Sequence, residues 1–310
     1  MVVRMESGRR PAERAVTERF VEVPRCDLFT RSLGEGEHVI VLHGGPGTVD
    51  HTYLLPEMDR LADVCQLVYY DQRGHGRSRG ELNPDDVSID RFVEDLGSVC
   101  DALELDVVTL LGHSWGTHLA LQFAIERPER VNRLILMNTI PASSTDYARY
   151  VEYRKELTTP LTDELRSLTS SAGFEEGDPE LAAEHLRLLT SVGIKRAADV
   201  SRLRLHFTRE NVLRGRMIFQ RFEQVLFSQP FDLLPSLARL TIPTLVIHGD
   251  HDFVPVTAAE HVAAALRGSR LVVIPECGHC AYLEAMDTVY AEVADFMRHE
   301  RQNSRSTIVD

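Results

Sequence analysis

Short apolar segments alternate with longer segments of helical periodicity along the first part of the chain. Four apolar runs bounded by turn residues predict buried strands at residues 38–44, 65–71, 106–112 and 131–138. Between them, residues 87–105 and 117–130 carry apolar side chains at the spacing of amphipathic helices. Buried strands that alternate with helices predict a mostly parallel sheet covered by helices on both faces.

This alternation stops near Ile140 and resumes near residue 241. The second part predicts strands at 244–250 and 270–276, and helices at 258–267 and 281–301. Residues 141–240 between the two parts are charged and helical in pattern, with no strand-like run. We therefore expect one α/β domain, built from residues 19–140 and 241–301, with a helical cap inserted at 141–240.

The ends of the chain carry weaker patterns. Residues 19–23 and 28–33 predict an initial hairpin, preceded by an arm at 1–18, and residues 302–310 predict a tail. The arm contains arginines without an apolar stretch behind them, which is not the pattern of a secretory signal.

Composition and net charge limit the kinds of molecule that the protein is expected to bind. The chain has 310 residues, 43% of them hydrophobic, and a formal net charge of −13, so it can bury a large core but is poorly suited to bind nucleic acid or an anionic membrane. No run approaches the roughly 18 apolar residues that span a bilayer. The odd, sparse set of five cysteines predicts no disulfide framework and favours a reducing compartment, the cytoplasm.

A candidate nucleophile lies between a predicted strand and a predicted helix. In LLGHSWGTHLAL, Ser114 occupies a G-x-S-x-G frame in which Gly112 and Gly116 leave room for a sharp, strained turn. A serine hydroxyl attacks efficiently only when a base removes its proton, so this interpretation requires a histidine and an orienting carboxylate later in the chain.

The carboxylate and the histidine are expected after the last two strands. TLVIHGDHDFVP offers Asp250 and Asp252. We favour Asp252, which lies further into the loop, whereas Asp250 is expected to brace the turn. His248 and His251 are expected to be structural or solvent-facing. His279, between the last strand and the last helix, has the position that the order nucleophile, acid, histidine requires.

His279 lies within CGHC, which resembles a dithiol redox motif. A thioredoxin-type dithiol begins a helix early in its domain, but only about thirty residues follow Cys280. We therefore interpret Cys277 and Cys280 as small residues that flank the histidine. Two cysteines without further ligands at a suitable spacing also argue against zinc.

Two loops complete the predicted site. HGGPG follows the first buried strand, where an oxyanion loop is expected, with residues His43, Gly44, Gly45, Pro46 and Gly47. We expect the amides of Gly45 and Trp115 to bind the oxyanion. In DQRGHGRS, Asp71 and Arg73 are expected to form a structural ion pair or turn network. The alternative bases His43, His75 and His113 are each expected to hydrogen-bond within their own loops, with His113 directed away from Ser114.

The motifs HGGPG, DQRGHGRS and GHSWG, in this order and spacing, resemble the α/β-hydrolase fold and most closely the prolyl aminopeptidase family of serine peptidases. The resemblance covers about residues 19–140 and 240–301. It implies a serine hydrolase that needs no cofactor or metal, takes a small molecule or short peptide, and releases an N-terminal residue, with proline as the candidate.

The cap departs from the pattern of that family. Prolyl aminopeptidases resemble one another in a tryptophan-rich cap with a glutamate that holds the substrate's amino group, whereas Trp115 is the one tryptophan here. Glu223, in IFQRFEQVLF, is the first candidate for an amine-binding acid in an apolar pocket, and Glu210 is the second. The alternative places Glu223 on the exposed face of an amphipathic helix. An esterase, lactonase or amidase on uncharged acyl substrates, and a non-catalytic binding protein, therefore stay open.

Overall fold

The predicted apolar runs form one nine-stranded sheet in a computed structural model that describes residues 14–224 and 228–305. The strand order is β1-β2-β4-β3-β6-β7-β8-β9, with β5 paired to β2. The strands are β1 Thr17–Val23, β2 Cys26–Leu33, β3 His38–Leu42, β4 Gln66–Tyr70, β5 Arg79–Gly80, β6 Val108–His113, β7 Val131–Met137, β8 Thr244–Gly249 and β9 Arg270–Ile274.

The sheet is parallel from β4 through β9 and antiparallel at its first edge. β1 pairs with β2 as the predicted hairpin, and β2 pairs antiparallel with β4. The pairs β4-β3, β3-β6, β6-β7, β7-β8 and β8-β9 are all parallel. The predicted fold class, a mostly parallel sheet flanked by helices, is confirmed.

Two hydrophobic cores cover the two faces of the sheet. Successive side chains of a strand point to opposite faces, so a strand buried on both sides contributes to both cores. In β3, Ile40 and Leu42 point into one core, and Val39 and Val41 point into the other. The first core contains α1 (Ile89–Ala102), α2 (Trp115–Glu126), α9 (Leu234–Leu237) and α10 (Val256–Ala265). The second contains α11 (Ala281–Glu284) and α12 (Met286–Arg305).

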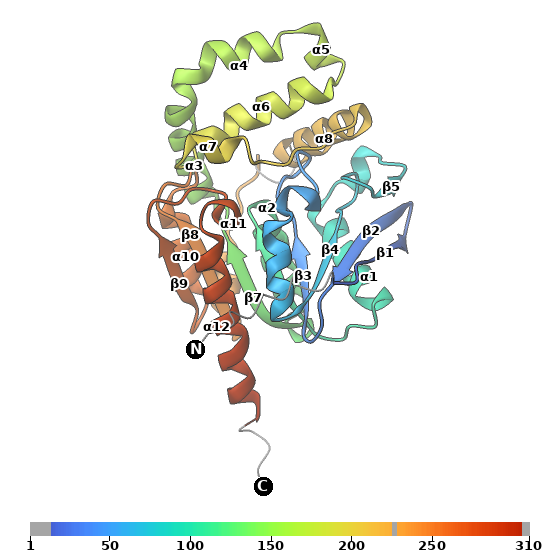
Figure 1. Cartoon of the computed structure of the whole chain (residues 1–310), viewed down its shortest axis with the longest axis vertical. Coiled ribbons are helices and arrows are strands. Elements are labelled where there is room, and N and C mark those ends of the chain that lie inside the picture. The colour runs from blue at the N-terminus through green and yellow to red at the C-terminus, as the bar shows by residue number, and fades with distance from the viewer. Residues whose placement is uncertain (1–13, 225–227, 306–310) are drawn as a thin grey trace, which may run out of the picture.

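The inserted segment forms a layer of helices at one end of the sheet, at the top of Figure 1. Its helices are α3 Ser144–Thr158, α4 Thr162–Thr169, α5 Ala172–Glu175, α6 Pro179–Ser191, α7 Ala197–Val200 and α8 Arg209–Phe222. The short helix α9 lies within the predicted cap range, but Leu237 is fully buried in the core beside α2 and α10.

Within the described residues, regular structure extends further toward both chain ends than predicted. β1 begins at Thr17, inside the predicted arm, because Thr17 pairs with Ser32 of β2. The last helix extends to Arg305, into the predicted tail, because its backbone hydrogen bonds continue past the last apolar turn. Residues 1–13 and 306–310, the remainder of these two predictions, lie outside the described residues.

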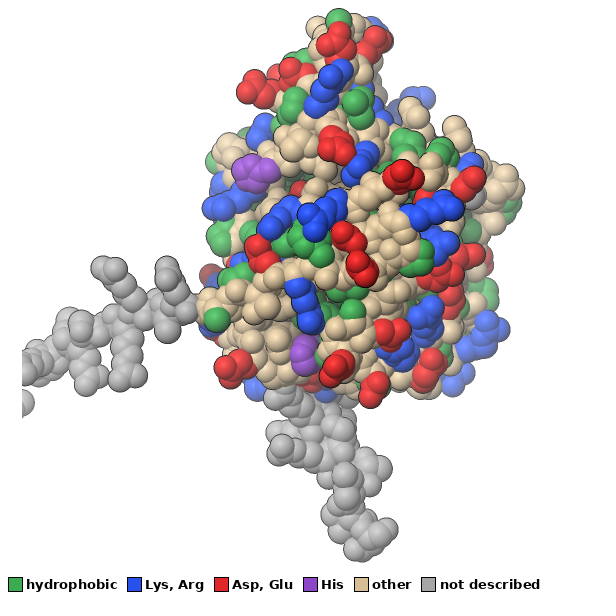
Figure 2. All heavy atoms as spheres, turned by 90° about the vertical axis from the view of Figure 1, so that its right-hand side faces the viewer, with side chains coloured by type: hydrophobic (Ala, Val, Ile, Leu, Met, Phe, Trp, Pro, Cys, Tyr) green, Lys and Arg blue, Asp and Glu red, His purple; other side chains and the backbone are tan. Residues whose placement is uncertain are grey.

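The face of the molecule in Figure 2 carries charges of both signs. On the face in Figure 2, acidic and basic side chains are interspersed over the sheet domain and the cap. Within the described residues, no helix is both long enough and apolar enough to cross a membrane.

Candidate active site

Ser114 lies at a sharp turn between β6 and α2. Its backbone has φ 54° and ψ −122°, an uncommon conformation for a residue with a side chain. Backbone atoms lie so close to the two glycines of the G-x-S-x-G frame that neither position has room for a side chain. A Cβ on Gly112 would lie 2.5 Å from the Gly116 carbonyl oxygen, and one on Gly116 would lie 2.0 Å from the Leu42 carbonyl oxygen. The turn therefore holds the Ser114 hydroxyl away from the backbone at the end of the sheet.

A chain of hydrogen bonds joins Ser114, His279 and Asp252. The Ser114 hydroxyl donates to His279 Nε2 at 2.9 Å, and His279 Nδ1 donates to Asp252 Oδ1 at 2.8 Å. The tautomer follows from the acceptor-only carboxylate on Nδ1. Asp252 and His279 are both buried, so water does not compete for the bond between them. The structure thus assembles the three residues that sequence spacing singled out, in the geometry of a nucleophile, a base and an orienting acid.

Asp252 is held in its ionised form. Burial by itself would raise its pKa, but the neighbouring His279 and His248 and the hydrogen bonds that it accepts lower the pKa to about 2. Asn138 also donates to Asp252, with Nδ2 2.9 Å from Asp252 Oδ2 and 2.9 Å from the Gly278 carbonyl oxygen. Asn138 therefore fixes the acid and the histidine loop relative to each other.

The HGGPG loop lies against the serine. A Cβ on Gly44 would approach Ser114 Cβ to 3.3 Å and the Tyr53 hydroxyl oxygen to 2.8 Å. The Gly44 amide donates to Tyr53 at 2.9 Å, which leaves the next amide, that of Gly45, as the loop's candidate oxyanion donor. Gly45 has φ 125° and lines the same cavity as Ser114, and Trp115 is the first residue of α2.

Three buried histidines connect loops to one another, so the prediction that they bond within their own loops is wrong in part. His43 bonds to the Gly44 carbonyl but also accepts from the Gln72 amide at 3.0 Å. His75 bonds to the Arg73 carbonyl and accepts from the Gly47 amide at 2.7 Å. The strand ends meet at one edge, so side chains there reach across loops.

His113 links the histidine loop to the oxyanion loop. Its Nε2 donates to the His279 carbonyl oxygen at 2.9 Å, and its Nδ1 accepts from the Tyr53 hydroxyl. It is directed away from the Ser114 hydroxyl, because both ring nitrogens are occupied by these partners. Burial and the nearby His279 lower the pKa of His113 to about 3, so it is neutral and cannot replace His279 as the base near neutral pH.

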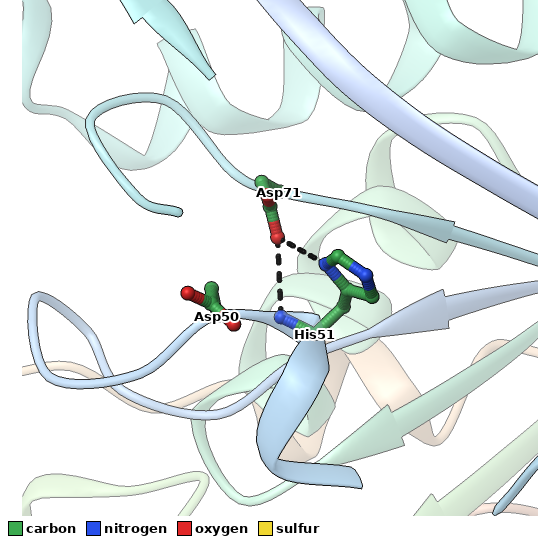
Figure 3. A group of neighbouring side chains, drawn as sticks. All are labelled: Asp50, His51 and Asp71. Carbon is green, nitrogen blue, oxygen red and sulfur yellow. Dashed lines mark hydrogen bonds and ion pairs between the residues drawn. The ribbon is translucent and has the colours of Figure 1, made fainter. Parts of the chain in front are cut away.

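Of the two alternatives predicted for Asp71 and Arg73, the ion pair between them is wrong, whereas the turn network holds for Asp71, which bonds to Arg77 and Ser78 of the same turn. Arg73 turns toward α1 and forms a bidentate pair with Asp95 at 2.6 and 2.9 Å. Asp71 accepts from the backbone amide and Nδ1 of His51, at 3.1 and 2.7 Å (Figure 3), and from the Arg77 amide. The side chains of Asp71 and Arg73 point to different parts of the molecule. Asp71 contacts His51, and Arg73 contacts α1.

Asp50, His51 and Asp71 are the described residues whose ligand atoms could hold a cation, since these atoms lie within 4.8 Å of one another. Figure 3 shows His51 directed at Asp71, with Asp50 beside them. His51 Nδ1 and Asp71 already bond to each other, and Asp50 accepts from the amide and hydroxyl of Thr52. A cation would have to displace these bonds. We therefore interpret the cluster as a hydrogen-bonded connection between the segment after the oxyanion loop and the end of β4, in preference to a metal centre.

Comparison with known proteins identifies the family of the chain. The sequence pattern of the alpha/beta hydrolase fold family matches residues 37–285. The chain belongs to the alpha/beta hydrolase fold family.

Relatives of this hydrolase differ in their named substrates. A proline iminopeptidase of Saccharolobus solfataricus is 26% identical over 275 residues, 86% of each chain. A 2-hydroxy-6-oxononadienedioate/2-hydroxy-6-oxononatrienedioate hydrolase of Klebsiella pneumoniae is 29% identical over 298 residues, 93% of this chain and 98% of that one. The proline iminopeptidase structure from Mycobacterium smegmatis has a TM-score of 0.69 at 22% identity, covering 93% of this chain and 100% of that one. These similarities establish a hydrolase without selecting a substrate.

The serine of this hydrolase opens into a cavity of about 520 Å³ between the sheet and the cap. Its walls are mostly aromatic and aliphatic, and they include Phe253, whose ring stacks on the His279 ring with centroids 4.0 Å apart. A cavity of this size fits a small acyl or peptide substrate.

The cap carboxylates predicted to bind an amine do not line this cavity in the described structure. Glu223 follows the last residue of α8 and is exposed. Burial, and secondly the charge of Glu223, raise the pKa of Tyr147 on the cavity wall. Glu210 is also exposed and pairs with Arg214 at 2.6 Å. The structure therefore does not support either residue as a buried amine-binding acid and agrees with the alternative that places Glu223 on the exposed side of an amphipathic helix, because α8 buries its apolar face.

Several residues of the site were missed at the level of sequence. Tyr53 and Gln72 hold the oxyanion loop, and Asn138 holds the acid. Gln72 also accepts from the Trp115 indole at 3.0 Å and so ties the loop to the elbow. Asn138 could have been found, because it directly follows a parallel strand at the functional edge of the sheet.

All five cysteines are free and buried, including the two beside His279. Burial raises the pKa of Cys277 to about 12 and that of Cys280 well above its ordinary value. Both thiols are therefore protonated near neutral pH, when a redox dithiol would need a reactive thiolate.

We expect Cys277→Ser combined with Cys280→Ser to keep most of the hydrolase activity, whereas His279→Ala loses at least about a thousandfold. The hydroxyls would be buried without assured partners, so the cost should appear in stability, on the order of 1–3 kcal/mol per site. Urea unfolding and kcat measured on the same samples separate the two effects. Loss of activity in the folded double variant comparable to that of His279→Ala would contradict this view of the thiols.

Proposed function

We propose that the protein is a serine hydrolase that cleaves small acyl substrates through an acyl-enzyme on Ser114. The proposal is carried by the Ser114–His279–Asp252 chain of hydrogen bonds at the floor of the cavity. His279 takes the hydroxyl proton as Ser114 Oγ attacks the carbonyl carbon, and returns it to the leaving group as the bond breaks. Water then attacks the acyl-enzyme, with the same histidine as base, and releases the acid and the free serine.

The cavity favours an acyl substrate without a free amine. Asp50 is the one carboxylate among the described residues that line it. Burial and the nearby Asp71 raise the Asp50 pKa, and its oxygen Oδ1 already accepts two bonds from Thr52. A substrate ammonium would thus meet no well-exposed acid in the cavity. The lining of the cavity is therefore best suited to the amine-free substrates of an esterase, lactonase, amidase or related acyl hydrolase.

Release of an N-terminal residue, with proline as the candidate, is the second possibility. It is supported by the relative named as a proline iminopeptidase and by the GHSWG elbow with its tryptophan after the serine. For either activity, we propose a small-molecule or short-peptide substrate and a reducing, cytoplasmic location, which the five free cysteines favour.

A fluorophosphonate probe tests the nucleophile and a matched substrate pair tests the class. The probe is expected to add its mass to Ser114, because the elbow and His279 activate this hydroxyl. Labelling that persists in Ser114→Ala would refute the assignment. Among 4-nitroanilide and 4-nitrophenyl substrates, we expect N-acetylprolyl and hexanoyl compounds to be cleaved at least as well as free prolyl compounds. A preference of about a hundredfold or more for the free amine would instead establish the aminopeptidase.

A further inference from the structure

Two arginines from the cap line the cavity above Ser114 without a carboxylate partner. Arg154 comes from α3 and Arg216 from α8, and both are half-buried. In the described part of the chain, neither forms an ion pair. Several cap arginines outside the cavity do pair with acids: Arg149 with Asp146, Arg166 with Asp163, Arg196 and Arg202 with Asp199, and Arg214 with Glu210.

Arg154 lies one aromatic ring away from the histidine of the site. Its guanidinium carbon is 4.7 Å from the centroid of the Phe253 ring, and the same ring stacks on His279, with ring centroids 4.0 Å apart. One of its nitrogens donates to the Tyr150 hydroxyl at 2.6 Å. This bond uses one of the five N–H donors, so the fork retains donors for a bidentate anion.

Arg216 adds positive charge from the opposite cap helix. It donates to the carbonyl oxygens of Phe174 and Glu175, and its guanidinium lies 4.3 Å from the centroid of the Phe174 ring. The ring of His185 packs on Phe174 with centroids 5.1 Å apart. Burial first, then Arg216 and Arg154, lower the pKa of His185, so both guanidinium charges reach this part of the wall.

A half-buried guanidinium loses part of its hydration and regains that energy only from an anion or from several acceptors. Among the described residues no acid pairs with Arg154 or Arg216, and both line the cavity into which Ser114 opens. We propose that Arg154, supported by the charge of Arg216, binds an anionic group on the acyl part of the substrate, so that the substrate class is a carboxylate-bearing acyl compound such as a half-ester of a dicarboxylic acid. This inference rests on the proposed serine hydrolase.

Mono-4-nitrophenyl adipate and 4-nitrophenyl hexanoate form a matched pair for the test, since they share the ester and the chain length and differ in the terminal carboxylate. Ser114 would form an ester with the acyl carbon, nitrophenolate would leave, and water would release adipate. We expect the parent protein to favour the adipate ester in kcat/KM. Arg154→Met should lower the ratio of adipate to hexanoate kcat/KM by at least about tenfold, and Arg154→Lys by less, because one charge-assisted bond discriminates by about this factor.

Arg166→Met is the matched control, because Arg166 is a mostly exposed arginine of the same cap that does not line the cavity. It should leave the ratio unchanged. A ratio that stays the same in Arg154→Met, or a parent protein that favours 4-nitrophenyl 6-aminohexanoate over both other esters, would overturn the proposal. A merely structural role of Arg154 would lower both ester rates alike and is thereby distinguished.

Calorimetric titration with adipate decides the question independently of turnover. Adipate should bind to Ser114→Ala, and at least about tenfold more weakly to the variant that also carries Arg154→Met. Undetectable binding to Ser114→Ala, or equal affinities, would overturn the anion site. Absence of fluorophosphonate labelling at Ser114, by contrast, would refute the proposed hydrolase mechanism while the titration still reports on the anion site.

Discussion

Ser114→Ala is expected to lower kcat on 4-nitrophenyl esters by about four orders of magnitude or more, because without the hydroxyl no acyl-enzyme forms. The remaining groups would still bind and polarise the carbonyl, so a small rate above that of water should persist. The loss should appear in kcat with little change in substrate binding, since the alanine side chain differs from serine by a single oxygen. Stopped-flow kinetics should also lose the initial burst of nitrophenolate where deacylation limits turnover.

Ser201→Ala provides a control for this variant. Ser201 is an exposed serine of the cap whose hydroxyl bonds to the Ala198 carbonyl oxygen. It should retain the parent rate. If Ser114→Ala instead kept a tenth or more of the parent activity, the nucleophile would have to be sought elsewhere, or the residue would only position water.

The free energy of unfolding is expected to fall as the pH is lowered from about 6.5 to 5, because several histidines are buried in neutral form. Burial, joined by neighbouring histidines for His43 and His113, lowers the pKa values to about 3 for His43 and His113 and to about 4 for His118. In the unfolded chain these groups bind protons below their ordinary pKa of about 6.5. Stability is therefore present above that value and is lost as the pH falls below it.

His118→Gln isolates one of these groups. The His118 ring stacks on Trp115 with centroids 5.4 Å apart, and burial is the one cause of its lowered pKa. The loss of stability between pH 6.5 and 5 should be smaller in the variant by about 2 kcal/mol. Acids whose pKa is raised by burial, such as Asp95 and Glu284, act in the opposite sense and are common to both proteins.

Urea unfolding at several pH values measures this difference, and His251→Gln is the control, since His251 is exposed. The control should follow the parent protein at every pH. An identical pH dependence in His118→Gln and the parent would show that His118 takes up a proton in the folded state as readily as in the unfolded one.

The order of strands and helices could be predicted from the sequence because it depends on local periodicity. In β3, every residue from Val39 to Leu42 is buried, and alternate side chains face opposite cores, so an uninterrupted apolar run was the correct indication of a parallel strand. The elbow could be predicted for a similar reason, since Gly112 and Gly116 are required by contacts a few residues away or with the adjacent strand.

The selection of Ser114, Asp252 and His279 also followed from local features. Ser114 directly follows β6, whereas Asp252 and His279 lie in the loops after β8 and β9, and these parallel strands end at one edge of the sheet. Chain order therefore sufficed to bring them together. The network that holds them was not predictable in the same way, because Tyr53, Gln72 and Asn138 have common residue types and meet their partners only across loops.

The sequence by itself determined the layered sheet, the elbow and the three residues that meet there, because these depend on side-chain period and on the backbone freedom of a few glycines. Only the tertiary structure decided the chemistry of the cap. The helical pattern of α8 showed that one face is apolar, but packing on the sheet decided that Glu223 faces solvent and that Arg154 and Arg216 face the cavity. Which side chains line a pocket depends on how several helices pack against one another and against the sheet. The spacing of apolar residues within one helix does not determine that packing.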